Sequence, residues 1–186
     1  FKDNNEEKLD VKEIENVEEL ELENDISIYL EIDGYNYHTS NILGMSIKDS
    51  KNNFFIKKEL VIDVLEKIKS KNITTYDAKK IICSTKVNIN CVFDEMIAAY
   101  LCNYNVKDDI AYLMGQFDED ICFYDTFIKE KDRDSKLKEY ICKKVNFIYE
   151  HKKILEDKIS DNNCGNLFSK IEMPLIKVLS DMEITG

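Results

Sequence analysis

Apolar and polar side chains alternate along residues 26–33, and this period of two predicts a β-strand over residues 26–32. The set facing one way is Ile26, Ile28, Leu30 and Ile32, and the set facing the other way is Ser27, Tyr29, Glu31 and Asp33. Apolar runs over residues 42–47 and 54–58 predict two more strands, with a polar turn between them. Because the connections are short, we expect the three strands to be antiparallel neighbours.

From residue 59 onward the apolar spacing becomes that of a helix. Helices are predicted over residues 59–70, from 77, over 92–103, 110–115 and 134–159, and from 167, with one short strand over 72–76. The apolar stripe of the longest helix is Leu137, Ile141, Val145, Ile148, Leu155 and Ile159. Asp77 and the pair Asp108 and Asp109 are expected as N-caps. Three strands followed by helices, with one strand among them, predict an α/β fold with a mixed β-sheet flanked by helices.

Acidic residues are unevenly distributed along the chain and concentrate at its N-terminal end. The chain has 186 residues and a net charge of −11, which suits one domain. Residues 1–25 hold eleven acidic and three basic residues, so the remaining 161 residues, with 26 acids and 23 bases, have a net charge of only −3. We therefore interpret residues 1–24 as an acidic linker that ends in a helical turn. The nearly neutral remainder argues against a strongly basic nucleic-acid groove.

The cysteines and histidines point to no metal or triad site. The six cysteines are Cys83, Cys91, Cys102, Cys122, Cys142 and Cys164, and they form no C-x-x-C pair and have no histidine at zinc spacing. We expect reduced thiols, several of them in the core, and a cytoplasmic protein. His38 and His151 receive no role. The acidic run at residues 118–120 is expected to be a solvated loop, and no apolar run is long enough to cross a membrane.

Glu31 and Asp33 leave three interpretations open, because they lie two residues apart on one strand face. They are half of a metal site, a solvated edge, or the remnant of a site that has been lost. Hard divalent cations prefer carboxylate oxygens, so the pair alone does not decide the matter.

Three collinear segments resemble the bacterial family A DNA polymerases. "IEMPLIKVLSDMEITG" (171–186) is similar to the first helix of their polymerase domain, "VFDEMIAAYLCN" (92–103) to a helix of their exonuclease-type domain, and "NYHTSNILGMSIKD" (36–49) to its second-strand region. The resemblance implies a ribonuclease H-like, DnaQ/DEDD exonuclease-type fold over residues 25–165. It further implies that residues 1–24 are the linker from an upstream 5′-nuclease domain and that 166–186 form the first helix leading into the polymerase domain.

Active editing domains of that family hold two metal ions with four carboxylates, and the resemblance locates those positions here. The first-strand D-x-E motif falls on residues 29–31, the second motif ends at residue 81, and the Y-x-x-x-D motif spans 140–144. The corresponding residues are Tyr29, Glu31, Ile81, Tyr140 and Lys144. Glu31 and Tyr140 match the family, whereas three of the four metal ligands are replaced. The resemblance therefore implies a degenerate exonuclease site of the kind found in some Firmicutes enzymes.

Each of these residues has an alternative interpretation. A substitute metal site would use Glu31, Asp33 and Asp77, and it is opposed by the positive charge of Lys144. Lys144 either pairs with Glu31, which would otherwise be a buried unpaired carboxylate, or extends to solvent. Ile81 indicates that apolar atoms fill the former cleft, and Tyr140 is expected to be a packing residue.

We therefore expect a non-catalytic structural domain without a cofactor or metal, within a monomeric polymerase that carries out DNA replication and repair. Its partners would be the polymerase and 5′-nuclease domains of the same chain, with DNA bound only through the parent enzyme and no membrane involved. One alternative is a weakly active metal-dependent 3′–5′ exonuclease. The other is a module that binds a protein partner through its acidic N-terminal segment.

Overall fold

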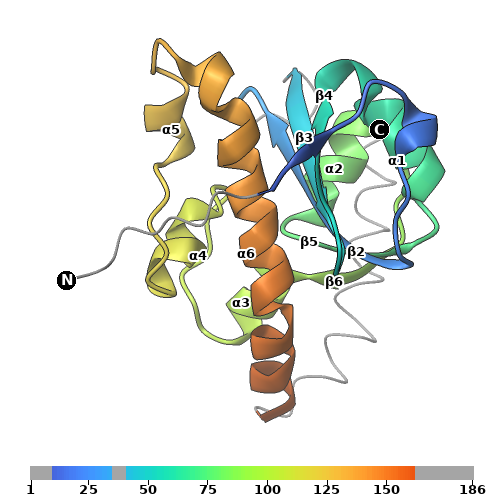
Figure 1. The fold of residues 1–186 in the computed structure, drawn as a ribbon. Coiled ribbons are helices and arrows are strands. Elements are labelled where there is room, and N and C mark those ends of the chain that lie inside the picture. The colour runs from blue at the N-terminus through green and yellow to red at the C-terminus, as the bar shows by residue number, and fades with distance from the viewer. Residues whose placement is uncertain (1–9, 35–40, 162–186) are drawn as a thin grey trace.

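The computed structural model describes residues 10–34 and 41–161, which form a mixed six-stranded sheet with helices on both faces (Figure 1). The strands are β1 (Lys12–Glu13), β2 (Asp25–Ile32), β3 (Ile42–Lys48), β4 (Asn53–Lys57), β5 (Asn72–Thr75) and β6 (Cys91–Asp94). The helices are α1 (Val61–Ile68), α2 (Ala78–Thr85), α3 (Glu95–Leu101), α4 (Ala111–Gln116), α5 (Tyr124–Phe127) and α6 (Arg133–Asp161), with short 3-10 turns η1 (Val17–Glu19) and η2 (Lys58–Leu60).

The strand order is β1-β4-β3-β2-β5-β6. β2, β3 and β4 are antiparallel neighbours, as the short connections predicted, while β5 and β6 continue the sheet in parallel to β2. The predicted mixed sheet is therefore confirmed. β2 lies in the middle of it, which places Tyr29 and Glu31 in the interior of the domain.

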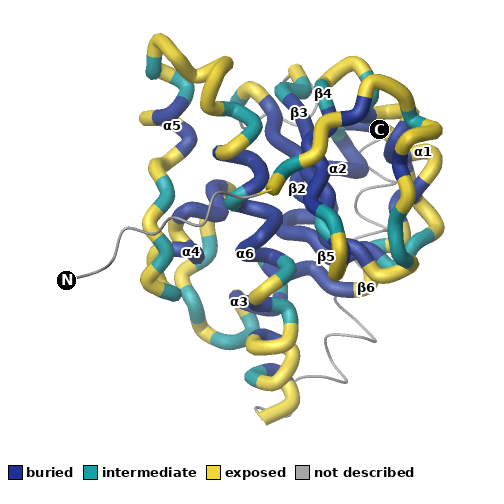
Figure 2. The backbone as a smooth tube through the Cα atoms, in the orientation of Figure 1, coloured by how far each residue is buried: buried dark blue, intermediate teal, exposed yellow. Residues whose placement is uncertain are grey.

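The two faces of β2 pack into two different hydrophobic clusters. Ile26, Ile28, Leu30 and Ile32 belong to a cluster that also contains buried residues of α1 and α2. Tyr29, on the opposite face, belongs to a cluster with residues of α4 and α6. Both faces are thus covered, and β2 is buried from its second residue to its last (Figure 2). The interpretation of Glu31 as part of a solvated edge is wrong, because only 4% of this residue is exposed.

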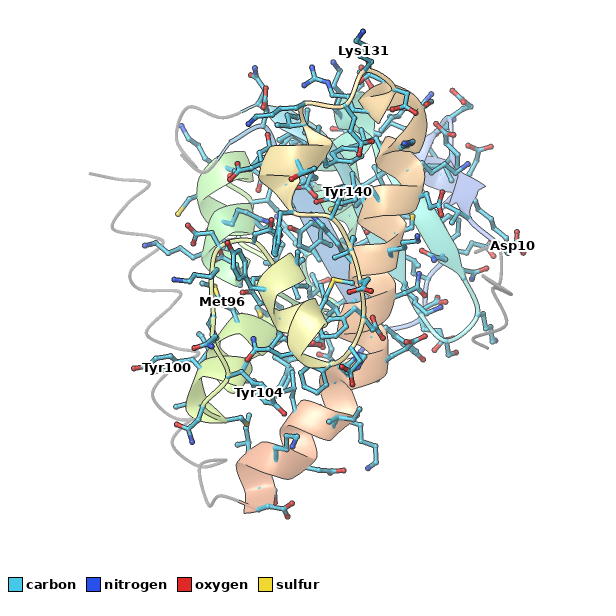
Figure 3. All side chains as sticks on the ribbon, turned by 90° about the vertical axis from the view of Figure 1, so that its left-hand side faces the viewer. Asp10, Met96, Tyr100, Tyr104, Lys131 and Tyr140 are labelled. Carbon is cyan, nitrogen blue, oxygen red and sulfur yellow. The ribbon has the colours of Figure 1, made fainter. Side chains whose placement is uncertain are left out.

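α6 is the long helix that the apolar spacing predicted, and it covers one face of the sheet. Leu137 is partly buried, and the other five residues of the predicted stripe are buried. Ser46 in β3 donates a hydrogen bond to the carbonyl oxygen of Ile141 over 3.0 Å, which ties the sheet to the helix. Figure 3 shows α6 beside the short helices α3, α4 and α5. Among the described residues, no helix is long and apolar enough to span a membrane.

One predicted boundary needs correction, and one short helix was not predicted. Residues 91–94 form β6, so the helix predicted over 92–103 begins only at residue 95. The reason is Asp94, whose carboxylate accepts from the Met96 N–H over 2.9 Å and so caps the helix after a β-favouring segment. α5 was not predicted, because the chain between residues 117 and 133 shows no clear period.

Residues 10–24 pack on the domain. β1 adds a parallel strand beside β4, and Ile14 and Leu20 are each only 3% exposed within the first hydrophobic cluster. The Asn16 carboxamide caps η1, which is the predicted helical turn. The packed unit therefore starts before residue 25, where the sequence suggested a linker.

Asp77 is the predicted N-cap of α2, whereas the N-cap of α4 is Ile110 and not Asp108 or Asp109. The Asp109 carboxylate accepts from the Ala111 N–H at the start of α4 over 2.9 Å. All described cysteines are free thiols; Cys83 and Cys142 are buried, and Cys122 is exposed. Cys164, His38 and the helix predicted from residue 167 lie outside the described residues.

Candidate functional site

Glu31 and Lys144 form a buried ion pair at the centre of the domain. Lys144 Nζ donates to Glu31 Oε2 over 2.7 Å, and the two side chains are 0% and 5% exposed. β2 presents Glu31 toward α6, and α6 presents Lys144 toward β2, so the pair joins two residues 113 positions apart. Two interpretations of Lys144 were open. In the structure Lys144 pairs with Glu31 and does not extend to solvent.

Two tyrosine rings enclose the ammonium group of Lys144. Its Nζ lies 4.0 Å from the ring centroid of Tyr140 and 5.0 Å from that of Tyr29. Both distances are typical of cation–π contacts, which favour a positive charge in a dry site. The Lys144 ammonium is therefore surrounded by one carboxylate and two aromatic faces.

Tyr29 and Tyr140 are held as packing residues. The Tyr140 ring stacks on Phe127 at 3.9 Å between centroids, and its hydroxyl donates to the Cys122 carbonyl over 2.9 Å. Burial, reinforced by the charge of Glu31, raises the pKa of the Tyr29 hydroxyl well above its ordinary value. Tyr29 therefore remains a neutral phenol, whereas a tyrosine binds a metal best as the phenolate.

Lys80 is a residue of this site that the sequence did not reveal. It lies in α2 and is only 6% exposed. Its Nζ donates to the Tyr29 hydroxyl over 3.3 Å and lies 4.3 Å from the centroid of the Tyr29 ring. Burial lowers its pKa, although the charge of Glu31 acts in the opposite direction. Two lysines thus approach the strand face that carries Glu31.

Ile81 does not fill the space beside Glu31, contrary to the sequence-based expectation. It is fully buried in the first hydrophobic cluster, with residues of the opposite face of β2. The neighbouring side chain in α2, Lys80, is the one that reaches Tyr29. Successive residues of a helix point about 100° apart, so Ile81 packs in the core while Lys80 contacts Tyr29.

The remaining space beside Glu31 is very small. A cavity of about 20 Å³ is lined by Tyr29, Glu31, Ile32, Gly34, Lys80, Asp108, Asp109 and Tyr124. This volume is close to that of one water molecule. A nucleotide does not fit in it without movement of the surrounding side chains.

Asp33 and Asp77 have other partners and are not gathered with Glu31. Asp33 is exposed and accepts from the Tyr124 hydroxyl over 2.8 Å. Asp77 accepts from the Lys80 N–H over 3.2 Å as the cap of α2. Among the described residues, the carboxylates of Glu31, Asp33 and Asp77 do not form a group whose oxygens lie within 4.8 Å of one another.

A second set of buried carboxylates lies at the end of β6. Asp94 accepts from the N–H groups of Asp77, Ala78 and Met96 over 3.1, 2.9 and 2.9 Å. Burial nevertheless raises its pKa to about 6. Glu95 is 0% exposed, and neither of its carboxyl oxygens has a hydrogen-bond partner among the described residues. Burial raises the pKa of the Glu95 carboxyl well above its ordinary value.

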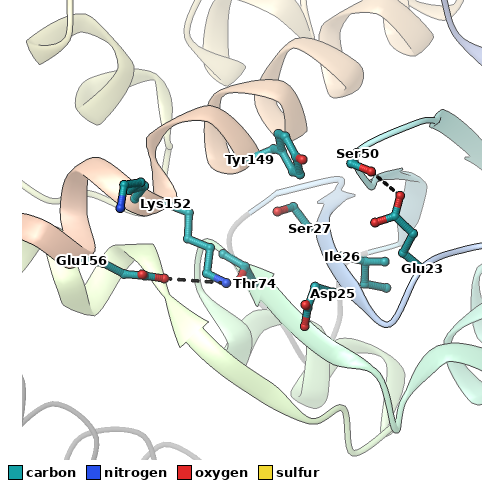
Figure 4. A pocket seen from close by; sticks show the side chains of 10 residues that line it. Glu23, Asp25, Ile26, Ser27, Ser50, Thr74, Tyr149, Lys152 and Glu156 are labelled. Atoms are coloured by element: carbon teal, nitrogen blue, oxygen red, sulfur yellow. Dashed lines mark hydrogen bonds and ion pairs between the residues drawn. The ribbon is translucent and has the colours of Figure 1, made fainter.

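A larger pocket of about 440 Å³ lies at the amino ends of β2 and β5, away from Glu31 (Figure 4). It is lined by Glu23, Asp25, Ile26, Ser27, Ser50, Thr74, Tyr149, Lys152, Lys153 and Glu156. The lining mixes both charge signs, and Lys152 Nζ pairs with Glu156 Oε1 over 3.6 Å. In open α/β sheets ligands bind at the carboxyl ends of the strands, so this position is not the expected one for an active site.

Comparison with known families identifies what this domain resembles. The family model described as "DNA polymerase I, ribonuclease H-like domain" matches residues 28–151. DNA polymerase I of Lactococcus lactis is 31% identical over 169 residues, which cover 85% of this chain and 19% of that protein. DNA polymerase I of Bacillus subtilis is 26% identical over 197 residues, which cover 97% and 22%. The chain thus spans about a fifth of the length of these relatives.

The fold is shared with known nucleases. Brucella melitensis NrnC has a TM-score of 0.68 and 14% identity, with 95% of this chain and 92% of that chain covered. Escherichia coli RNase D, described as an exoribonuclease involved in structured RNA processing, has a TM-score of 0.65 and 11% identity over 84% and 44%. At such identities the likeness concerns the fold, and it confirms the ribonuclease H-like class that the sequence predicted.

Proposed function

Since the chain belongs to the family of ribonuclease H-like domains of DNA polymerase I, we propose that it is a non-catalytic, exonuclease-like structural domain of such a polymerase. The observation that carries the proposal is the 2.7 Å contact between Lys144 Nζ and Glu31 Oε2 in a fully buried position. A two-metal nuclease site needs carboxylate oxygens that are free to bind cations. Here an ammonium already occupies the oxygen that Glu31 directs toward α6.

The charges around Glu31 oppose metal binding in a second way. Lys144 and Lys80 bring two amines to the strand face on which Glu31 lies. A divalent cation placed there would be repelled by the Lys144 ammonium at short range. The Tyr29 hydroxyl is a poor substitute ligand, because its raised pKa keeps it protonated.

The proposed role of the domain is mechanical support. It would hold the polymerase domain that follows it and separate that domain from an upstream 5′-nuclease domain. The parent protein would extend DNA primers in replication and repair, as the relatives' name indicates. The packing of residues 10–24 on the sheet favours this role over capture of a protein partner by an acidic arm.

The proposal is tested by a nuclease assay on a 3′-end-labelled DNA single strand in Mg²⁺ or Mn²⁺. The 186-residue chain is compared with its Glu31→Ala variant, and an active 3′–5′ exonuclease provides the positive control. We expect no release of nucleotide above the protein-free background from either protein. Release by the wild-type chain that Glu31→Ala abolishes would instead identify a working metal site and overturn the proposal.

A further inference from the structure

A cluster of potential metal ligands lies away from the Glu31 site. His151 and Glu150 belong to α6, and Glu119 belongs to the loop after α4, which lies beside α6 in Figure 1. One ligand atom from each residue lies within 4.8 Å of the other two. Within the described part of the chain, these are the three residues that come together in this way.

His151 is oriented in the manner typical of metal-binding histidines. Its Nδ1 lies 2.9 Å from the carbonyl oxygen of Phe147. Since a carbonyl oxygen only accepts, Nδ1 carries the proton, and Nε2 is left with its lone pair. In metal sites a hydrogen bond from the second ring nitrogen to a backbone carbonyl commonly fixes this tautomer.

The ring of His151 is held rigidly and directed at the carboxylates. The residue is 8% exposed, and its ring stacks on Phe147 at 4.0 Å and meets the edge of Phe117 at 4.9 Å between centroids. Its Nε2 points toward Glu119 Oε1 at 3.9 Å, which is too long for a hydrogen bond. A nine-tenths buried imidazole is therefore directed at the Glu119 carboxylate without making a hydrogen bond through Nε2 to any described residue, and the Glu150 carboxylate belongs to the same cluster.

The charge balance favours a cation between these groups. A neutral imidazole and two carboxylates have a net charge of −2. Lys152 and Lys153, which follow His151, are paired with Glu156 over 3.6 Å and Asp157 over 3.9 Å. In the described part of the chain, no lysine or arginine lies within 4 Å of the Glu119 or Glu150 carboxylates.

We propose that His151, Glu119 and Glu150 form a binding site for a divalent transition-metal cation of the zinc type. An imidazole nitrogen with two carboxylate oxygens is a ligand set that Zn²⁺ accepts, with a water molecule as the fourth ligand. Tetrahedral coordination would place the ligand atoms about 3.3 Å apart, so the two flexible glutamate side chains must close in by at most roughly 1.5 Å. The bound ion would join the loop at residue 119 to α6 and stabilise the helical side of the domain.

Isothermal titration of Zn²⁺ into the 186-residue chain tests this site. Glu119→Gln removes one ligand charge at nearly constant size, and Glu156→Gln is the matched control on the exposed face of α6. We expect one saturable site in the wild type and in Glu156→Gln, weakened about tenfold or more in Glu119→Gln. We also expect Zn²⁺ to raise the melting temperature of the wild type more than that of Glu119→Gln.

Cobalt substitution excludes binding through the free thiols. Co²⁺ bound to the proposed site would give visible bands of nitrogen and oxygen ligation, without the near-ultraviolet charge-transfer band of a thiolate. The titrations are repeated in a Cys122→Ser background, because Cys122 is the exposed thiol among the described residues. The absence of saturable Zn²⁺ binding, equal affinity in Glu119→Gln, or a thiolate band would overturn the proposal.

Discussion

Glu31 and Glu95 are both buried glutamates, but the partners of their carboxyl groups differ. Glu31 is paired with the Lys144 ammonium at 2.7 Å, between two tyrosine rings. Glu95 has no hydrogen-bond partner in the part of the chain that the structure describes, and burial raises its pKa. The first carboxylate lies beside a cation, whereas burial without such a partner raises the pKa of the second. Asp94 is intermediate, since three backbone N–H groups partly offset its burial.

The comparison teaches that burial alone does not indicate which carboxylates are functional. Burial raises the pKa of Glu95 well above its ordinary value, yet Glu95 lies against α6 and lines none of the pockets described above. Glu31 lies where the resemblance to polymerases implies a metal site, yet its partner is a lysine. The partner, and not the degree of burial, distinguishes the two sites.

Removal of the Lys144 ammonium is expected to have the largest effect. Lys144→Met should lower the free energy of unfolding by about 3–5 kcal/mol at neutral pH, because Glu31 is left as an unpaired buried charge. Urea denaturation measures this loss. Lys143→Met is the matched control, since Lys143 is partly exposed and its pair with Glu139 is 3.3 Å long; we expect a change below about 0.5 kcal/mol there.

The same pair can be removed as a unit. Lys144→Met combined with Glu31→Gln should recover most of the stability that Lys144→Met loses, because the carboxylate that Lys144 compensated is removed as well. A double variant as unstable as Lys144→Met alone would mean that Lys144 acts through its packing against Tyr29 and Tyr140, and not through the charge of Glu31.

Removal of the Glu95 carboxyl group is expected to raise the free energy of unfolding, whereas Lys144→Met lowers it. Glu95→Met should raise the stability at pH 7 by about 1–3 kcal/mol, because it removes a buried polar group without partners.

Glu95→Gln tests the pH dependence of stability separately. The folded carboxyl of Glu95 keeps its proton above the ordinary pKa of 4.5, so the wild type loses stability as the pH rises from that value toward the folded pKa. The Gln variant should lose less stability over this interval, and parallel pH profiles would contradict the assignment.

Asp94→Asn should have a smaller, destabilising effect of about 1–2 kcal/mol, because an amide replaces the carboxylate that caps both α2 and α3. Thermal unfolding measures the loss. An NMR titration should find the Asp94 carboxyl half-protonated near pH 6. A midpoint at its ordinary 3.8 would show that the three N–H groups outweigh burial.

Lys80→Met is expected to be the mildest change, within about 1 kcal/mol of the wild type. The loss of the 3.3 Å contact with Tyr29 is offset because a cation no longer needs to be buried. Denaturation at neutral pH checks this. A loss comparable to that of Lys144→Met would show that both amines, and not Lys144 alone, compensate Glu31.

Much of the fold and the central pair could be predicted from the sequence. The alternation along residues 26–33 placed Tyr29 and Glu31 on one strand face, and the helical stripe placed α6 correctly. The resemblance to polymerases then brought residue 144 to the same site, which is the contact that the structure contains. Strand and helix periods are local signals, and they were sufficient to place β2 and α6.

The remaining features depend on packing between distant elements. Lys80 and Ile81 are neighbours in α2, and only the angle at which α2 lies on the sheet decides that Lys80 reaches Tyr29. Residues 10–24 appear as a linker because their acidic composition outweighs a few apolar residues, yet Ile14 and Leu20 are buried. The partnerless Glu95 has no sequence signal at all, since it follows an ordinary helix cap.

The Glu31–Lys144 pair also limits how such a domain can change by single substitutions. Replacing Lys144 by an acidic residue would place two carboxylates in contact inside a buried site, while Tyr29 and Ile81 would still be unable to help bind a metal. Each single step back toward a metal-binding set therefore passes through a less stable protein. Loss of nuclease chemistry along this route would be difficult to reverse, because a lineage that has exchanged its metals for a lysine must change several codons together before selection for activity can act.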